Sequence, residues 1–115
     1  LGAIATDTNF SGADLSEADV SEADFSRVIA LGVRLDGVIG ESVILVSAIL
    51  DDGSFVEAEL FGADFTNASC VNVVLTDADL SDAIVDGADF TGAVFSDETV
   101  CPSGEPQIDE PNCSF

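Results

Sequence analysis

Residues 13–25 read ADLSEADVSEADF, in which Ala-Asp followed by an apolar residue occurs three times at intervals of five residues. The same interval runs from Ala3 to Val100. At the twenty multiples of five up to 100, only Gly40 lacks an apolar side chain, and thirteen residues are Leu or Phe. A helix repeats its apolar face every 3.6 residues and a strand every 2 residues, so neither produces this period. A fixed short period is typical of a chain that winds into stacked coils.

The motif Ala-(Asp/Asn)-(Leu/Phe)-X-X, as in Ala13-Asp14-Leu15 and Ala63-Asp64-Phe65, resembles that of the pentapeptide-repeat family, and the resemblance covers residues 3–100. It implies an all-β fold, a right-handed quadrilateral parallel β-helix with four repeats per coil and one repeat on each side. The central Leu or Phe then points inward and stacks on the residue twenty positions later. About five coils at roughly 4.8 Å would make a rod roughly 24 Å long. We expect a single domain that spans the chain, with the β-helix over residues 1–100 and a short C-terminal cap over residues 101–115.

The three cysteines differ in their positions. Cys70 occupies a central position of the repeat and is expected to act as a small buried hydrophobe. Cys101 and Cys113 bracket a segment that breaks the repeat and contains all three prolines. We expect this segment to fold back over the end of the β-helix as a cap, closed by a Cys101–Cys113 disulfide, which would indicate an oxidising compartment. Two free thiols in a tail are the alternative.

The charge of the chain is extreme. There are 23 acidic residues against Arg27 and Arg34, with no Lys or His, for a net charge of −21. Direct nucleic-acid binding is excluded, because phosphate neutralisation needs Lys and Arg. No stretch approaches the roughly 18 apolar residues of a membrane span, so no membrane insertion is expected. The acids permit a basic protein partner, a divalent cation or mimicry of nucleic acid, and solubility is the simplest interpretation.

The composition also argues against catalysis. Without His there is no Ser-His or Cys-His pair, and without Lys there is no phosphate-binding Lys loop or Schiff base. The acidic residues match no known calcium-binding loop. We therefore predict a protein that is not an enzyme, with no cofactor and no metal site.

Because residues twenty apart should stack, the surface can be mapped from the sequence. One column forms an acidic edge, whose like charges repel unless they serve solubility, a cation or a basic partner: Glu17, Gly37, Glu57, Asp77 and Asp97. Outward positions elsewhere are unusually apolar, and we expect them to form a protein-docking surface: Ile29, Leu31 and Ile49, with Ile44 and Val46 at its border. The alternative is that Ile and Val suit any strand position.

Two classes of function remain. The first is a structural or protein-interaction module that docks to, or helps to assemble, a photosynthetic membrane complex from the lumenal side. The thylakoid-lumen members of the family, in cyanobacteria and chloroplasts, are similar in their acidity and disulfide-bracketed cap. Leu1 lies inside the repeat, which indicates either a removed presequence or a piece of a longer chain.

The second class is an acidic DNA mimic in the cytoplasm that binds DNA gyrase and inhibits or protects it. Family members of that class usually dimerise through a C-terminal apolar helix. Here Pro102, Pro106 and Pro111 predict that no such helix forms.

Overall fold

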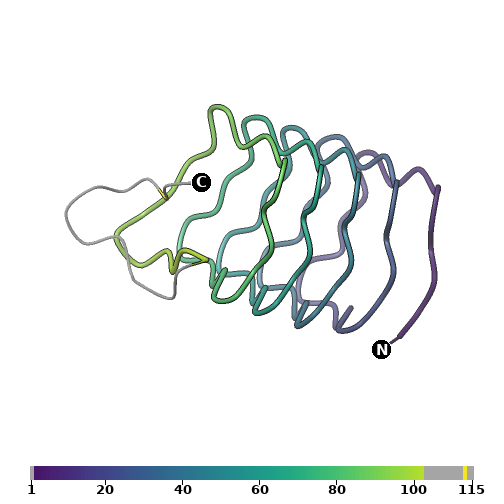
Figure 1. The fold of residues 1–115 in the computed structure, drawn as a ribbon, viewed down its shortest axis with the longest axis horizontal. Coiled ribbons are helices and arrows are strands. Elements are labelled where there is room, and N and C mark those ends of the chain that lie inside the picture. The colour runs from purple at the N-terminus through teal and green to yellow at the C-terminus, as the bar shows by residue number, and fades with distance from the viewer. Residues whose placement is uncertain (1, 103–112, 114–115) are drawn as a thin grey trace.

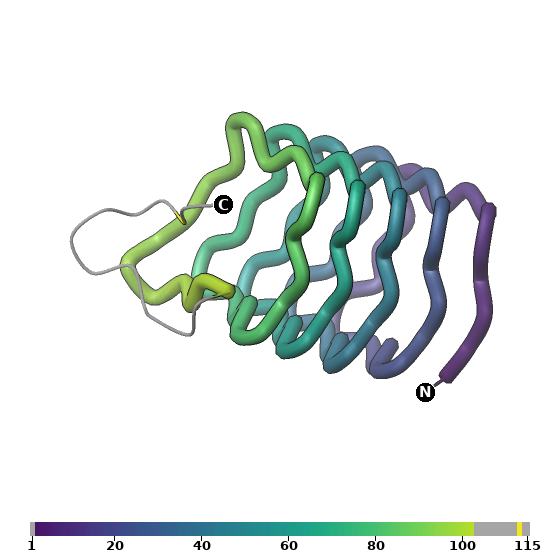
Figure 2. The backbone as a smooth tube through the Cα atoms, in the orientation of Figure 1, coloured from purple at the N-terminus to yellow at the C-terminus, as the bar shows by residue number. Residues whose placement is uncertain are grey.

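The computed structural model describes residues 2–102 and residue 113. Over these residues the chain winds into stacked coils that form one rod, with the N-terminal residues at one end (Figure 1). The described residues contain no helix and no strand longer than a single bridged residue. Instead, a parallel bridge recurs every five residues and joins positions twenty apart, such as Ile4 with Asp24 and Asp24 with Ile44. The expected parallel β-helix is therefore confirmed, and successive coils follow one another in register (Figure 2).

The rod has four sides, which we number along the chain starting from the side of Phe10. The inward central residues are Phe10, Ala30, Leu50, Cys70 and Phe90 on side 1, and Leu15, Leu35, Phe55, Leu75 and Phe95 on side 2. They are Val20, Gly40, Leu60 and Leu80 on side 3, and Phe25, Leu45, Phe65 and Val85 on side 4. Sides 1 and 3 are therefore opposite each other, as are sides 2 and 4.

Each corner is a tight turn with one residue in the left-handed region. At the corner after Phe10, the N–H of Ala13 donates to the Phe10 carbonyl at 2.9 Å, and Gly12 has a φ of 73°. Positive φ at the third residue defines a type II turn. The same conformation recurs every five residues from Gly2 to Gly92, and no β-branched residue occupies any of these positions. The turns therefore explain why the fifth letter of the repeat avoids Val, Ile and Thr.

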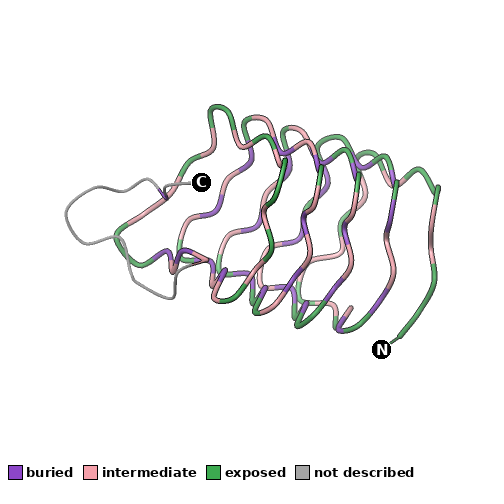
Figure 3. Ribbon diagram, viewed as in Figure 1, coloured by how far each residue is buried: buried purple, intermediate pink, exposed green. Residues whose placement is uncertain are grey.

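Inward side chains form a continuous apolar core. Leu45 and Phe65 are neighbours in one column on side 4, and both are buried as predicted. Cys70 is buried on side 1 and has a free thiol. Along each coil of the middle of the rod, buried residues alternate with partly or fully exposed ones (Figure 3). The core therefore extends along the axis of the rod, and every coil contributes to it.

The volume of the core is redistributed in the second coil. Ala30 and Gly40 stand on opposite sides at central positions where other coils carry larger residues. A Cβ atom added to Gly40 would lie 3.1 Å from Leu60 Cδ2 and 3.3 Å from Val43 Cγ1, so its neighbours already fill that space. Valine replaces the usual alanine at the other inward position of this coil: Val28, Val33, Val38 and Val43. Small central residues and large flanking residues thus compensate each other.

The expectation that the five-residue frame runs unbroken to Val100 is wrong. Asp79 pairs with Val100, which is twenty-one residues away, and the Leu80 N–H donates to the Val100 carbonyl at 2.8 Å. Val100 therefore takes the outward bridged position, and the buried Thr99 and Cys101 take the two inward positions. The β-helix consequently extends past residue 100.

Ser96 is the additional residue. Its hydroxyl accepts the N–H of Asp77 at 2.9 Å, a role that a backbone carbonyl has at the equivalent corners. The hydroxyl of Thr99 accepts the Ser96 N–H at 3.0 Å and donates to the Leu75 carbonyl at 2.7 Å. Two hydroxyl side chains therefore satisfy the backbone groups that the insertion displaces.

The structure joins Cys101 to Cys113 in a disulfide, with 5.5 Å between the two Cα atoms. Both residues are buried. The rest of the expected cap, residues 103–112 and 114–115, lies outside the described residues. The division of the chain into a β-helix and a cap therefore remains a prediction.

Candidate interaction surfaces

The described residues offer no pocket suited to chemistry. A cavity of about 20 Å³ near the N-terminal end has room for about one water molecule, and its lining, which includes Phe10, Leu15 and Phe25, is apolar. Burial raises the pKa of the Cys70 thiol to about 12, so this cysteine stays protonated and unreactive. No group of three or more potential metal ligands occurs among the described residues. Within the same residues, no helix has the length and apolar character needed to cross a bilayer.

Three of the five residues predicted for protein docking form an exposed apolar surface on side 1. Ile29 and Ile49 are bridged to each other on adjacent coils and are 42% and 38% exposed. Leu31 follows at the corner between sides 1 and 2 and is 46% exposed. We call these three residues the side 1 apolar surface. It is one bridged pair of isoleucines with a leucine beside it.

The other two predicted residues lie at the margin or outside it. Val46 begins the corner between sides 4 and 1 and is half-buried, so it borders the side 1 apolar surface. Ile44 is also half-buried, but it lies on side 4 between Asp24 and Asp64 in its bridge column. The structure therefore separates Ile44 from the exposed isoleucine pair by a corner and by acidic neighbours.

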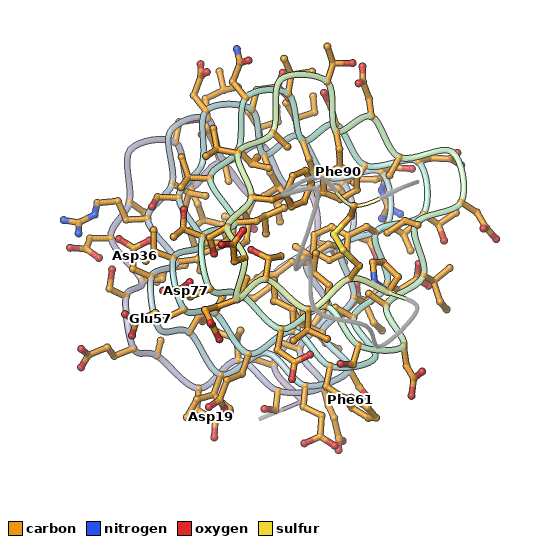
Figure 4. The ribbon with its side chains drawn as sticks, turned by 90° about the vertical axis from the view of Figure 1, so that its left-hand side faces the viewer. Asp19, Asp36, Glu57, Phe61, Asp77 and Phe90 are labelled. Carbon is orange, nitrogen blue, oxygen red and sulfur yellow. A yellow bond between two sulfur atoms is a disulfide. The ribbon has the colours of Figure 1, made fainter. Side chains whose placement is uncertain are left out.

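Sequence reasoning missed five exposed apolar residues: Ile4, Ile39, Phe61, Ile84 and Val94. Ile39, on side 3, is 40% exposed and is bridged to Asp19 and Glu59. Phe61 is exposed at the corner between sides 3 and 4 (Figure 4). The outward-position rule that identified Ile29 would also have found Ile39, whose neighbours are acidic. Ile39 is therefore a natural control for the isoleucines of side 1.

Acidic residues gather on side 3 and on the corner that precedes it. Figure 4 looks along the rod and shows Glu57 and Asp77 close together at this corner. Side 3 continues the acidic surface in its bridge column, where Glu59 pairs with Asp79. We call the following residues the side 3 acidic surface: Glu17, Asp19, Glu57, Glu59, Asp77, Asp79 and Glu98.

The acidic edge predicted from the sequence is correct in its first members and wrong in its last. Glu17, Glu57 and Asp77 share the positive-φ position of successive coils at this corner. The one-residue insertion in the last coil places Asp97 at the first turn residue of this corner. Glu98 therefore occupies the second turn position, which the sequence had assigned to Asp97. The physical cause is the extra residue Ser96 in the last corner.

Many outward carboxylates are committed to backbone hydrogen bonds. Asp24 accepts the N–H of Ser26 at 3.0 Å and its hydroxyl at 2.6 Å. Asp89 accepts the same two groups from Thr91. These hydrogen bonds, from the hydroxyl first and the N–H second, lower the pKa of both carboxyl groups. The Asp of the repeat therefore satisfies the one N–H of each corner that has no carbonyl partner.

Ser54 and Ser69 replace the aspartate of the repeat, and at their corners an aspartate of the preceding coil accepts the hydrogen bonds instead. Asp51 accepts the Val71 N–H at 3.0 Å and the Ser69 hydroxyl at 2.6 Å. Asp36 accepts the equivalent N–H and hydroxyl from Val56 and Ser54.

Burial opposes ionisation of Asp36, but the hydrogen bonds from the Ser54 hydroxyl, the Val56 N–H and Arg34 outweigh it and lower the pKa. The sequence signal for such a bond between coils is an Asp with a Ser eighteen residues later, which the repeat motif does not contain.

Both arginines already have acidic partners. The Arg27 guanidinium lies 3.0 Å from Asp7 at the corner between sides 4 and 1, and its hydrogen bond lowers the pKa of Asp7. Arg34, on side 2, lies between Asp14 at 3.7 Å and Asp36 at 3.2 Å. These pairs are exposed, and such pairs contribute little to stability. Arg27 is thus the one described cation next to the side 1 apolar surface.

The fold and its surfaces define a solenoid that presents side chains on four flat sides. The family model for pentapeptide repeats matches residues 2–29 and 58–97 in eight copies, which is more than half of the chain. The protein therefore belongs to the pentapeptide-repeat family, whose solved members form right-handed quadrilateral β-helices. Members of this family typically serve as structural or interaction proteins.

Solved structures resemble the chain along most of its length. The pentapeptide-repeat protein Rfr23 from the cyanobacterium Cyanothece 51142 is 24% identical with a TM-score of 0.50, covering 84% of this chain and 62% of that one. A trypsin-treated form of QnrB1, a plasmid-mediated fluoroquinolone resistance protein, is 20% identical with a TM-score of 0.50, covering 90% and 64%.

A pentapeptide-repeat protein of the Arabidopsis thaliana thylakoid lumen is 26% identical with a TM-score of 0.44, covering 87% and 64%. The chain thus spans less than two thirds of the length of these structures. The likeness to Rfr23 and QnrB1 supports the fold alone. The search of curated proteins found no match.

The interval that the family model leaves unmatched, residues 30–57, contains most of the unusual surface. It includes Leu31 and Ile49 of side 1 and most of the inward valines of the second coil. A parallel bridge nevertheless recurs every five residues through this interval, as in the bridges of Arg34 with Ser54 and of Ile39 with Glu59. The departure from the family motif therefore alters the surface and the packing, and the coil path is retained.

Proposed function

We propose that the protein is a non-enzymatic interaction module that contacts other proteins through two opposite sides of its rod. One observation carries the proposal: exposed Ile29, Leu31 and Ile49 lie on side 1, whereas the acidic surface lies on side 3. Contiguous exposed apolar side chains in a soluble protein usually mark a contact. The acidic side would attract a basic protein surface and speed its association.

We further propose that the module works in the thylakoid lumen, where it docks to a photosynthetic membrane complex or helps to assemble it. The Cys101–Cys113 disulfide supports an oxidising compartment. The side 3 acidic surface supports a partner subunit with a basic exposed surface. No cofactor is part of this proposal.

A pull-down from detergent-solubilised thylakoid membranes tests this function. A variant with Glu57→Gln and Asp77→Asn should lose a membrane-complex subunit that the wild-type chain retains. Ile29→Asp with Ile49→Asp tests side 1 in the same way, with Ile84→Asp as the control at a similarly exposed position on side 4, outside both proposed surfaces. All variants should keep the β-helix, because the changed side chains point outward. Retention of the same proteins by every variant would refute the proposal.

Mimicry of DNA is the second candidate, favoured by the concentration of carboxylates on one side of a narrow rod. In that case the wild-type chain should alter DNA gyrase activity in a supercoiling assay. Neutralising Glu17, Glu57, Asp77 and Glu98 should abolish the effect, and the isoleucine variants should preserve it. If neither assay responds to any variant, both candidates are wrong and the acidity serves solubility alone.

A further inference from the structure

The middle of side 1 is the least charged part of the rod. Beside Ile29 and Ile49, one corner carries Arg27, which is ion-paired with Asp7, and the other corner carries Asp51 and Asp52. The side 3 acidic surface lies across a rod that is 24 Å wide. That distance is more than twice the Debye length of roughly 8 Å at physiological ionic strength. Side 1 is therefore the direction from which another highly acidic molecule is repelled least.

We propose that two copies of this protein pair through side 1, so that the occupant of the side 1 apolar surface is a second copy of the chain. This inference rests on the proposed function, because it uses the same docking surface and names its partner. A strongly basic partner fits side 3 better, since the acids that would attract it are gathered there. A second copy presents a surface that is equally apolar and less acidic than side 3.

The order of the corners favours a parallel pair with its two-fold axis along the rods. In that arrangement, the corner between sides 4 and 1 of one copy faces the corner between sides 1 and 2 of the other. Arg27 then faces the edge that carries Asp51 and Asp52, about one coil away, and this contact occurs twice by symmetry. Ile29 meets its own counterpart, and Leu31 of one copy lies between Arg27 and Val46 of the other.

An antiparallel pair brings the corner between sides 4 and 1 against itself. Arg27 of one copy would then lie opposite Ser47 of the other, which occupies the same turn position one coil further along. That arrangement leaves Asp51 and Asp52 of the two copies facing each other across the other edge. Charge complementarity therefore selects the parallel pair.

The area available on one side is sufficient for a specific contact. The accessible surface of the chain is 5564 Å², and a standard interface uses about 800 Å² from each partner. One side of a four-sided rod supplies approximately that much. Pairing through side 1 also leaves both side 3 acidic surfaces facing outward, so a pair could hold two basic partners at once.

Sedimentation equilibrium of the purified full chain tests the pairing. We expect a monomer–dimer equilibrium that shifts toward dimer when salt rises from about 20 mM to about 300 mM, because salt screens the repulsion between two chains of net charge −21. Ile29→Asp with Ile49→Asp should weaken dimerisation by roughly a hundredfold. The control Ile39→Asp should leave it unchanged, and circular dichroism should show the same fold for all.

Cross-linking tests the orientation. The double variant Leu31→Cys with Val46→Cys should form a disulfide-linked dimer under mild oxidation, whereas Leu31→Cys alone should not, because the two copies of residue 31 lie on opposite edges. Efficient cross-linking by the single variant would overturn the parallel arrangement.

A wild-type chain that stays monomeric up to roughly 1 mM would overturn the pairing itself. That result leaves the proposed function standing if the side 3 variants still lose their membrane partner. If every variant kept both self-association and partner binding, the pairing and the proposed function would both be overturned.

Discussion

Residues 28–50 and residues 58–97 build the same coils from different side chains. The second region follows the family motif, with Ala63 and Asp64 before Phe65, and the family model matches it. The first region places Val43 and Ile44 before Leu45, and the family model passes over most of it. Both regions nevertheless show the same bridges, the same corner conformation and an inward central column, which is only partly buried from Val85 to Phe95.

The comparison shows which parts of the motif the fold requires. A turn residue that tolerates positive φ and a central inward side chain persist in both regions, with the small central Ala30 and Gly40 compensated by neighbouring valines. The alanine and the aspartate of the motif can be replaced where a neighbouring residue compensates for the change. Valine fits where the central residue shrinks to Gly40. Where Ser69 takes the place of the aspartate, Asp51 supplies the carboxylate from the preceding coil. The family motif is therefore one of several solutions to the same packing and hydrogen-bonding requirements.

The largest expected effect comes from removing the core that both regions share. Phe65→Ala should lower the free energy of unfolding by about 3–5 kcal/mol and Leu45→Ala by about 2–5 kcal/mol, because each leaves a cavity in one continuous column. Chemical denaturation followed by circular dichroism measures both. If Leu45→Ala cost less than about 1 kcal/mol, the middle coils would be loosely packed and the equivalence of the two regions would fail.

The Cys101–Cys113 disulfide is expected to contribute less to the free energy of unfolding than the core does. Replacing Cys101 and Cys113 by Ser should lower stability by about 3 kcal/mol, because the open chain gains conformational entropy when unfolded. Thiol titration checks the pairing: the native protein should show no rapidly reacting thiol, and the unfolded, non-reduced protein should show only that of Cys70. Three thiols in the unfolded protein would contradict the disulfide and the oxidising compartment inferred from it.

The compensation between small and large inward residues can be tested at Gly40. Gly40→Ala should destabilise by about 1–3 kcal/mol, because the new Cβ meets Leu60 and Val43. Combined with Val43→Ala, it should cost less than the sum of the single changes by at least about 0.5 kcal/mol. The pair Gly40→Ala with Val73→Ala, a valine further along the rod, should be additive. Additivity in both pairs would show that the valines do not compensate for the glycine.

The smallest expected effect concerns the outward column in which Asp24 and Ile44 are bridged. Asp24→Ala should slightly lower the thermal midpoint at pH 7, since two hydrogen bonds from Ser26 are lost. The pKa of Asp24 is lowered in the fold, so its contribution is present above the ordinary value of 3.8 and disappears as the pH falls through the lowered pKa. Ile44→Ala should show no such pH dependence. If the change in thermal midpoint caused by Asp24→Ala depended on pH in the same way as that caused by Ile44→Ala, the Asp24 carboxylate would not be acting as an acceptor.

The amino-acid sequence determined the path of this chain. The period of five placed Leu45 and Phe65 in one inward column, and it placed every corner residue from Gly2 to Gly92, because burial and positive φ each restrict which side chains are allowed. The exposed isoleucines on side 1 also followed from counting. This worked because a solenoid places residues by a fixed interval, so position in the sequence is almost position in space.

Only the tertiary structure decided the departures from that interval. Val100 and Cys101 are both apolar, so an apolar pattern cannot tell which of them faces inward. The choice was made by hydrogen bonding, since Thr99 can enter the core only because its hydroxyl reaches the Leu75 carbonyl. In the same way, Asp51 became an acceptor for the next coil because stacking brought it there. Periodicity reports which side chains avoid water, whereas the register at an insertion depends on which polar groups find partners once the coils have stacked.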